Sequence, residues 1–118
     1  MREREDRQDI GELLIRYATG IDRRDWSLFR TVFTGDCELD YGQVGPWRGV
    51  DAVTYFMEQV HAAAGHTLHR ITNQAVDVEG DRAAARSYVD VLIMAADNPT
   101  GVNAAGFYDD ELVRTPQG

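Results

Sequence analysis

The spacing of apolar residues changes past the middle of the chain, from a period of three to four residues to a period of two. This alternation predicts three long strands, over residues 68–78, 83–95 and 102–115. Glu79-Gly80-Asp81-Arg82 is a tight-turn sequence between the first two strands, and residues 97–101 form a second turn. Short turns join antiparallel neighbours, so the sequence predicts a meander of three antiparallel strands.

The first half of the chain carries the helical period instead. Apolar residues at steps of three and four predict a helix over residues 8–22, with a stripe formed by Ile10, Leu13, Leu14, Tyr17, Ala18 and Ile21. The charged residues 1–7 are expected to be a frayed start. Asp25 is expected to cap a second helix over residues 26–32, and a third helix is expected over residues 51–64.

A short strand over residues 37–41 and a loop over residues 42–49 are expected before the third helix. Helices that are segregated from an antiparallel sheet make an α+β domain. If three helices close the concave side of a curved sheet, they leave a conical cavity, which is a common type of small-molecule site.

Length and charge restrict the classes of partner. The 118 residues are enough for one domain with one core. Acidic residues outnumber basic ones by 20 to 12, and the formal charge of −8 argues against nucleic acid or an anionic membrane as a partner. No apolar run approaches the roughly 20 residues of a membrane span, and the charged N-terminus lacks the apolar core of a signal peptide. Cys37 is the only cysteine, so a cytoplasmic location is expected.

Asp22 and His69 are the main candidates for chemistry. Asp22 extends the 14–18–22 row of the first helix, and His69 lies within the first long strand, so both border apolar surface. A carboxylate that orients an imidazole is the usual way to build a general base near neutral pH. Two other interpretations stay open: Asp22 as a helix cap or a partner of Arg23 and Arg24, and His69 as a partly exposed side chain bonded to backbone.

The neighbours of His69 depend on the strand register. With a two-residue turn at Gly80-Asp81, His69 lies opposite Leu92, and Tyr88 and Asp90 share its face. A register error of one residue would reverse that choice. His61, His66 and His69 have poor spacing for a metal site, so no metal is expected.

Six stretches along almost the whole chain resemble the SnoaL-like branch of the nuclear-transport-factor-2-like superfamily. They include Ile21-Asp22-Arg23-Arg24-Asp25-Trp26, Phe33-Thr34-Gly35-Asp36, Gly49-Val50-Asp51-Ala52-Val53, His69-Arg70-Ile71-Thr72-Asn73, the segment 76–83 and Gly106-Phe107-Tyr108. The resemblance implies a single cone-shaped α+β domain over residues 1–118. Family members usually continue into a final Trp-containing strand, which the resemblance implies this chain lacks.

The resemblance also implies site residues. Several eliminating enzymes of this branch use an Asp–His dyad, and Asp22 and His69 fall at its positions. Scytalone dehydratase and the bile-acid 7α-dehydratase use a Tyr on the first strand, where this chain has Tyr41, and the latter has a Tyr that matches Tyr17. Either tyrosine could instead be a core aromatic. The second pocket His of scytalone dehydratase has no counterpart after His69. The expected substrate-binding residues are Asn73, Tyr88, Asp90, Trp26 and Phe56.

The resemblance implies a cofactor-independent lyase or isomerase that acts on a hydrophobic cyclic molecule such as a polyketide, steroid or terpenoid. One alternative is a non-catalytic module that binds a hydrophobic ligand or dimerises. A weaker alternative is kinship with the small subunits of ring-hydroxylating dioxygenases. We also expect a homodimer through the outer face of the sheet, where the assumed register places an apolar strip: Ala83, Ala85, Val89, Val91 and Ile93.

Overall fold

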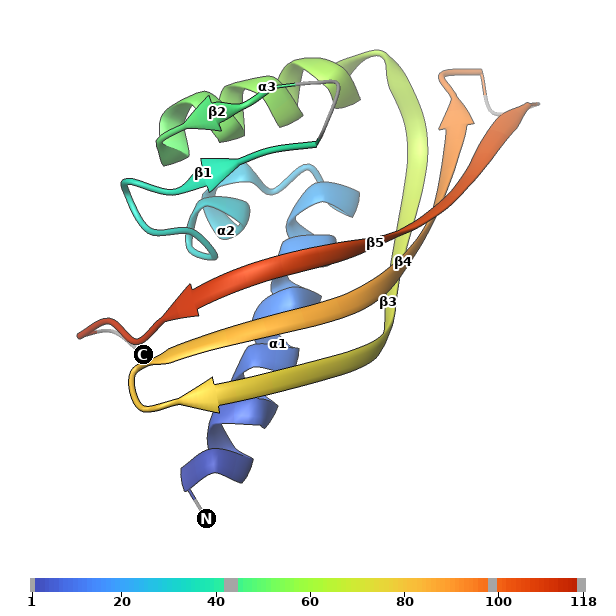
Figure 1. Ribbon diagram of the computed structural model, residues 1–118. Coiled ribbons are helices and arrows are strands. Elements are labelled where there is room, and N and C mark those ends of the chain that lie inside the picture. The colour runs from blue at the N-terminus through green and yellow to red at the C-terminus, as the bar shows by residue number, and fades with distance from the viewer. Residues whose placement is uncertain (1, 42–44, 98–99, 117–118) are drawn as a thin grey trace.

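The computed structural model describes residues 2–41, 45–97 and 100–116. Along the chain its elements are α1 (Arg2–Asp22), α2 (Trp26–Arg30), β1 (Glu38–Leu39), β2 (Trp47–Arg48), α3 (Val50–Ala62), β3 (Ala64–Glu79), β4 (Arg82–Ala95) and β5 (Gly101–Val113). β1 and β2 form a small antiparallel sheet, while β3, β4 and β5 form a larger antiparallel sheet in that order (Figure 1). The structure therefore has the mixed helical and antiparallel-sheet architecture that the sequence predicts.

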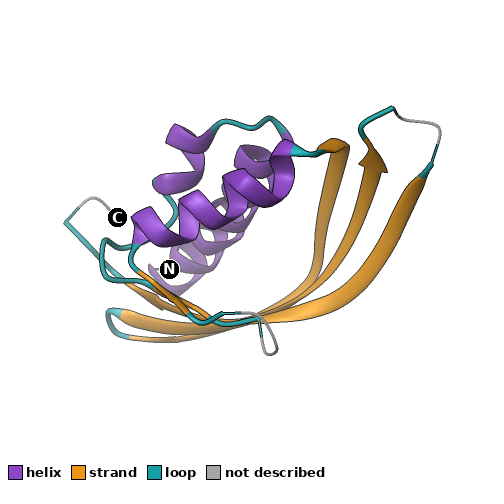
Figure 2. Ribbon diagram, turned by 90° about the horizontal axis from the view of Figure 1, so that it is seen from above, coloured by secondary structure: helices purple, strands orange, loops and turns teal. Residues whose placement is uncertain are grey.

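The larger sheet is curved, and the helices lie on its concave side (Figure 2). α1 packs against β3, and α2 packs against α1 and α3. The core forms within this layer, from Tyr17, Ile21, Phe29, Val53 and Met57. The end of the sheet where β3 begins, β4 ends and β5 begins extends past the helices (Figure 2). That end leaves part of the concave face uncovered by the helices.

α1 begins at Arg2, so the prediction of a frayed start is wrong for residues 2–7. Arg7 pairs with Glu3 one turn earlier, at 2.9 Å. The guanidinium group of Arg114 donates two hydrogen bonds to the Asp6 carboxylate, at 3.1 and 2.8 Å, and a third to Asp81 at 2.8 Å. These contacts tie the start of α1 to the β3–β4 turn, so the alternating charges form ion pairs instead of fraying.

A bulge in β3 changes the register of the sheet. Thr72 pairs with Tyr88 and Ala75 pairs with Arg86, so two residues of β3, 73 and 74, lie opposite the single residue 87. Asn73 has a φ of 51°, in the left-handed region that Asn adopts more readily than most residues. The turn at residues 79–82 has the predicted pairing, but on the other side of the bulge each residue of β3 pairs one position earlier in β4 than predicted.

His69 consequently lies opposite Val91, and the predicted pairing with Leu92 is wrong. Directly opposed residues project to the same face of a sheet, so Val89 and Val91 share the concave face with His69. Tyr88 and Asp90 project to the convex face instead. Burial agrees with this assignment, because Val89 is 8% exposed and Tyr88 is 54% exposed. The strip predicted to form the outer face therefore belongs to the inner face.

Candidate active site

The carboxylate of Asp22 meets the imidazole of His69 at the end of α1. Asp22 Oδ1 lies 2.7 Å from His69 Nδ1, and Asp22 Oδ2 accepts a hydrogen bond of 2.9 Å from the backbone amide of His69. The two side chains are only 18% and 7% exposed. Two contacts between the same residues fix both the carboxylate plane and the ring position. The predicted pairing of these distant residues is present.

This geometry selects one tautomer of the neutral imidazole. An ionised carboxylate only accepts hydrogen bonds, so His69 Nδ1 carries the proton that points at Asp22. The other ring nitrogen, Nε2, is then left with a lone pair and makes no hydrogen bond among the described residues. An oriented imidazole with a free Nε2 is the arrangement that a general base requires.

Two further residues hold the carboxylate in place: Thr67, which the sequence analysis did not single out, and Arg24, which it named only as a direct partner of Asp22. The Thr67 hydroxyl donates to Asp22 Oδ1 at 2.9 Å. Arg24 Nη1 donates to the Thr67 hydroxyl oxygen at 2.9 Å and to the carbonyl of Ile21 at 2.7 Å, and Arg24 Nη2 donates to the carbonyl of Gly65 at 2.7 Å. Arg24 has a φ of 56°, in the left-handed region. Its side chain thereby joins the end of α1 to the start of β3.

Three tyrosines gather beside the dyad and form what we call the tyrosine cluster: Tyr17, Tyr41 and Tyr108. The hydroxyl groups of Tyr17 and Tyr41 lie 2.8 Å apart. The ring of Tyr17 meets the rings of Tyr108 and His69 edge-on, at centroid distances of 5.8 and 6.4 Å. Tyr17 and Tyr41 are therefore brought together as predicted. Tyr108 was missed because its face depends on the register of β5.

The tyrosine cluster supplies neutral hydrogen-bond donors. Burial raises the pKa of Tyr17 well above its usual value, and the hydroxyls of Tyr41 and Tyr108 add to that shift. Burial likewise raises the pKa of Tyr41 and of Tyr108. The three phenols therefore stay protonated at neutral pH, as donors to an oxygen that gains negative charge must be.

A second imidazole, His61 in the last turn of α3, lies close to the dyad. Its ring centroid is 6.2 Å from that of His69, and the residue is 8% exposed. The Nδ1 atom lies 2.7 Å from the carbonyl oxygen of Met57, which only accepts, so Nδ1 is the donor. Burial lowers the pKa of His61, with smaller contributions in the same direction from Arg24 and His69. His61 is therefore neutral at neutral pH.

The sheet wall near His69 is apolar. His69 lies in one row with Val91 and Ala104, between the rows Thr67–Ile93–Val102 and Ile71–Val89–Gly106. Trp26, a predicted substrate-binding residue, packs against Phe29 and lies 6.2 Å from the ring of His61. Phe56 stacks on Trp47 at a centroid distance of 3.8 Å. Trp26 therefore lies beside His61, close to the dyad, whereas Phe56 packs against β2.

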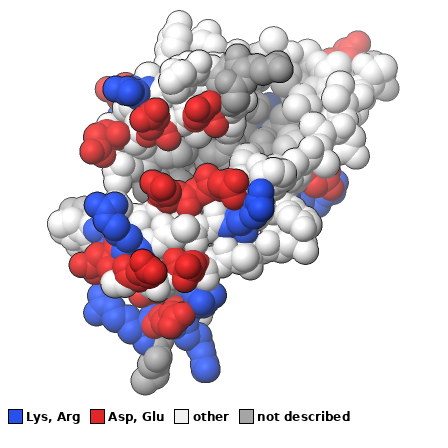
Figure 3. Space-filling model, in the orientation of Figure 1, with Lys and Arg blue, Asp and Glu red and all other residues white. Residues whose placement is uncertain are grey.

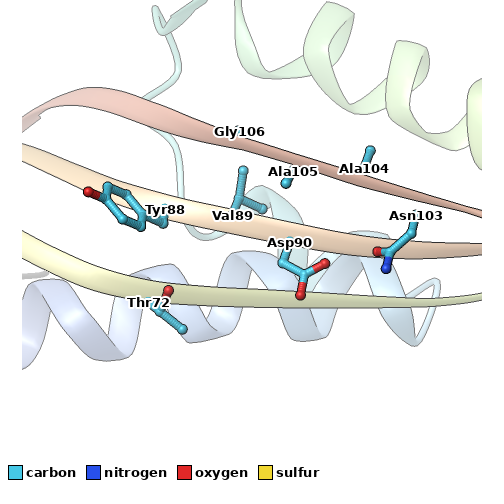
Figure 4. A pocket seen from close by; sticks show the side chains of 8 residues that line it. All are labelled: Thr72, Tyr88, Val89, Asp90, Asn103, Ala104, Ala105 and Gly106. Atoms are coloured by element: carbon cyan, nitrogen blue, oxygen red, sulfur yellow. The ribbon is translucent and has the colours of Figure 1, made fainter.

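Three predicted substrate-binding residues lie apart from the dyad. Tyr88 and Asp90 are on the convex face, because the bulge reverses the assumed register, and Asn73 is exposed within the bulge itself. A hollow does exist on the convex face (Figure 4). It is lined by Thr72, Tyr88, Val89, Asp90, Asn103, Ala104, Ala105 and Gly106. The prediction that Asn73, Tyr88 and Asp90 lie beside His69 is therefore wrong.

The charged side chains are distributed unevenly over the surface. Acidic groups gather on both sides of a hollow between β5 and the β1–β2 sheet (Figure 3). Asp36, Glu38 and Asp40 are exposed around β1, and Asp109 and Glu111 are exposed on β5. Within the described ranges, no three His, Cys, Asp or Glu side chains are grouped so that they could hold a metal ion. In the same part of the chain, no helix is long and apolar enough to cross a membrane.

Comparison with known proteins places this arrangement in a family. Residues 2–118 match the SnoaL-like domain. An uncharacterised protein of Mycobacterium tuberculosis (strain ATCC 25618 / H37Rv) is 32% identical over 118 residues, covering 96% of this chain and 78% of the relative. Two crystal structures from Novosphingobium aromaticivorans are also similar.

The first, provisionally named an aromatic ring hydroxylase, is 36% identical with a TM-score of 0.89, over 97% of this chain and 82% of that one. The second, provisionally named a scytalone dehydratase, shares the fold at 22% identity with a TM-score of 0.88, over 97% of this chain and 77% of that one. The chain belongs to the SnoaL-like domain family.

Proposed function

We propose that this protein is a cofactor-independent lyase or isomerase, of the dehydratase or cyclase type, that acts on a hydrophobic cyclic small molecule. The observation that carries the proposal is the 2.7 Å hydrogen bond between Asp22 Oδ1 and His69 Nδ1 in a site where both side chains are largely buried. This bond leaves His69 Nε2 free to accept a proton. Dehydration and isomerisation both begin with such a transfer.

In the proposed reaction, His69 Nε2 removes a proton from the carbon next to a carbonyl group. The electron pair of the broken C–H bond moves into an enolate, whose oxygen accepts hydrogen bonds from the tyrosine cluster. Asp22 stabilises the imidazolium that forms. The imidazolium then returns its proton to a departing hydroxyl group in an elimination, or to another carbon in an isomerisation. The sequence contains no lysine, so a lysine Schiff base is not an alternative route to the same carbanion.

Two features support an uncharged hydrophobic substrate. The sheet wall beside His69 is formed by aliphatic side chains, including Val91, Ile93 and Val102. Acidic side chains on both sides of the nearby hollow disfavour an anionic ligand (Figure 3). Relatives carry provisional names of a hydroxylase and a dehydratase. The general base at His69 and the neutral donors of the tyrosine cluster are what a dehydratase needs, so they favour this activity over hydroxylation.

The test is deuterium exchange into cyclic ketones, with cyclohexanone, 2-tetralone and a 3-ketosteroid as probes in D2O. The protein should accelerate exchange at the carbon next to the carbonyl. His69→Gln should lose about 10²–10⁴-fold of that acceleration, the range typical of general base catalysis. His66→Gln is the matched control, because His66 is exposed, three residues away, and should leave the rate unchanged. Equal exchange in His69→Gln would contradict the proposal, and tight ketone binding without exchange would favour a binding module.

We also propose a homodimer through the convex face of the sheet. Its large apolar side chains are 51%, 54% and 58% exposed at Leu68, Tyr88 and Phe107. Two ion pairs, Arg70–Asp90 and Arg86–Asp109, lie on the same face. Exposed apolar side chains of this size, grouped on one face of a sheet, favour contact with a second copy of the chain.

A further inference from the structure

The hydrogen bonds that end at Asp22 begin at a fixed positive charge. Arg24 donates to the Thr67 hydroxyl oxygen, so the hydroxyl proton of Thr67 must point elsewhere, and it points at Asp22 Oδ1. The same oxygen of Asp22 accepts from His69 Nδ1. The donors converge on this carboxylate: Arg24 donates to Thr67 and Thr67 to Asp22 on one side, and His69 donates to Asp22 on the other. Each of these bonds is between 2.7 and 2.9 Å long.

The charged groups joined by these bonds give the site a different net charge in each form of His69. With a neutral imidazole, the Asp22 carboxylate balances the Arg24 guanidinium, and the local charge is zero. A proton on His69 makes the local charge positive in a site where the imidazole is 7% exposed. His61, 6.2 Å away, adds no negative charge, and Tyr17, whose ring meets that of His69, is a neutral phenol. A proton on His69 therefore adds a second positive charge to a site that already contains the Arg24 guanidinium.

We propose that Arg24 and Thr67 are positioning residues of the site, which hold Asp22 in one orientation and place the Arg24 charge where it opposes the positive charge that His69 gains when it acts as a base. This inference rests on the proposed function for its role in catalysis. The electrostatic effect itself can be measured in the resting protein. Neither residue touches the reacting atoms, since both act through the carboxylate of Asp22.

The size of the effect follows from the bond lengths. Three consecutive hydrogen bonds of 2.9, 2.9 and 2.7 Å separate Arg24 Nη1 from His69 Nδ1, so the direct distance is at most about 8.5 Å. One unit charge at this distance, with an effective dielectric constant of about 20–40, changes proton affinity roughly 5- to 30-fold. Removal of the charge should move the midpoint of the His69 titration to higher pH by about one unit.

The experiment is a pH titration of the three imidazoles by 15N NMR, with His61→Asn and His66→Gln variants to assign the signals. Arg24→Met should raise the midpoint for His69, and Arg24→Lys, which keeps the charge, should not. Arg23→Met is the matched control, since Arg23 is an exposed arginine next in the chain and its loss should have a much smaller effect. Thr67→Val should reduce the population of the Nδ1–H tautomer, and Thr67→Ser should restore it.

Two results would overturn the inference: Arg24→Met shifting the His69 midpoint no more than Arg23→Met does, or Thr67→Val behaving as Thr67→Ser does. If Arg24→Met does not fold, the Thr67 pair alone decides the outcome. The titration does not require turnover, so it can succeed while the deuterium-exchange test fails, or fail while that test succeeds. Where turnover is found, the acidic limb of kcat should move to higher pH in Arg24→Met and stay in place in Arg23→Met.

Discussion

A double-mutant cycle on Asp22 and His69 tests the central contact through stability alone. Asp22→Asn keeps one acceptor oxygen but removes the charge, and His69→Phe removes the ring donor while it preserves most of the ring's shape. The backbone amide of His69 remains in every variant, so its own bond to Asp22 Oδ2 is not counted in the His69→Phe change. The cycle therefore isolates the additional strength that the carboxylate charge gives to the side-chain bond.

The magnitude follows from burial and geometry. A hydrogen bond to a charged group contributes about 1.5–3 kcal/mol and a neutral one about 1 kcal/mol, so the coupling should be about 1–2 kcal/mol. Solvent screening reduces it little, because the side chains are 18% and 7% exposed. Asp22→Asn alone should cost more, about 2–4 kcal/mol, because the new amide N–H₂ faces the donors that the carboxylate accepted from.

The assay is urea unfolding of the four proteins at pH 8, followed by circular dichroism. The same cycle with His66→Phe in place of His69→Phe is the control, and exposed His66 should show no coupling with Asp22 within about 0.5 kcal/mol. A coupling of that same negligible size between Asp22 and His69 would refute the reasoning. It would mean that the charged carboxylate stabilises the side-chain hydrogen bond no more than the neutral amide of Asp22→Asn does.

The remaining predictions concern the register, the pH response and the assembly. Val89→Asp should destabilise the fold by about 3–5 kcal/mol in urea unfolding, because it buries an unpaired charge. Tyr88→Asp, at the adjacent exposed position, should cost less than about 1 kcal/mol. Equal costs would contradict the assignment of Val89 to the concave face and Tyr88 to the convex face. Burial lowers the pKa of His61 from its ordinary 6.5, so the folded state binds fewer protons than the unfolded state, and the stability that is full above pH 6.5 should decline as the pH falls below it. The variant His61→Asn, which keeps a donor for the Met57 carbonyl, should lose less stability between pH 8 and pH 5. An identical pH profile in the variant and the unchanged protein would contradict this. Phe107→Glu should convert the proposed dimer into a monomer in sedimentation velocity, while Val113→Glu, also exposed at 43% but at the far end of β5, should not.

The local features of the fold were predictable because each depends on a few neighbouring residues. The 14–18–22 row of α1 has Leu14 and Ala18 buried and Asp22 beside them, as the helical period predicts. The Asp25 carboxylate caps α2 by accepting from the Leu28 amide at 3.0 Å. The turn at residues 79–82 also has its predicted pairing. In each case the relevant partners lie within a few residues along the chain.

The errors came from interactions between distant segments. At the N-terminus, the Glu3–Arg7 spacing is a local helical signal, but the contact that ties this segment to the rest of the fold joins Asp6 to Arg114, 108 residues away. Nothing in the sequence near Asn73 required a bulge, because alternation of apolar and polar residues is weak from 72 to 75. One extra residue in a strand inverts the faces of everything counted through it. The positions of Tyr88 and Asp90 were wrong for this reason.

The dyad prediction held despite that error because it did not depend on counting through the bulge. Thr67 and His69 reach Asp22 from the stretch of β3 between residues 67 and 72, where two-residue alternation continues without interruption. The contact is made directly between α1 and β3 and does not involve β4. Tyr108, by contrast, lies on β5. The face to which it projects depends on the pairing of β5 with β4, and also on the pairing of β4 with β3 across the bulge. Site residues joined by direct helix-to-strand packing were therefore accessible from the sequence, while those joined through two strand pairings required the structure.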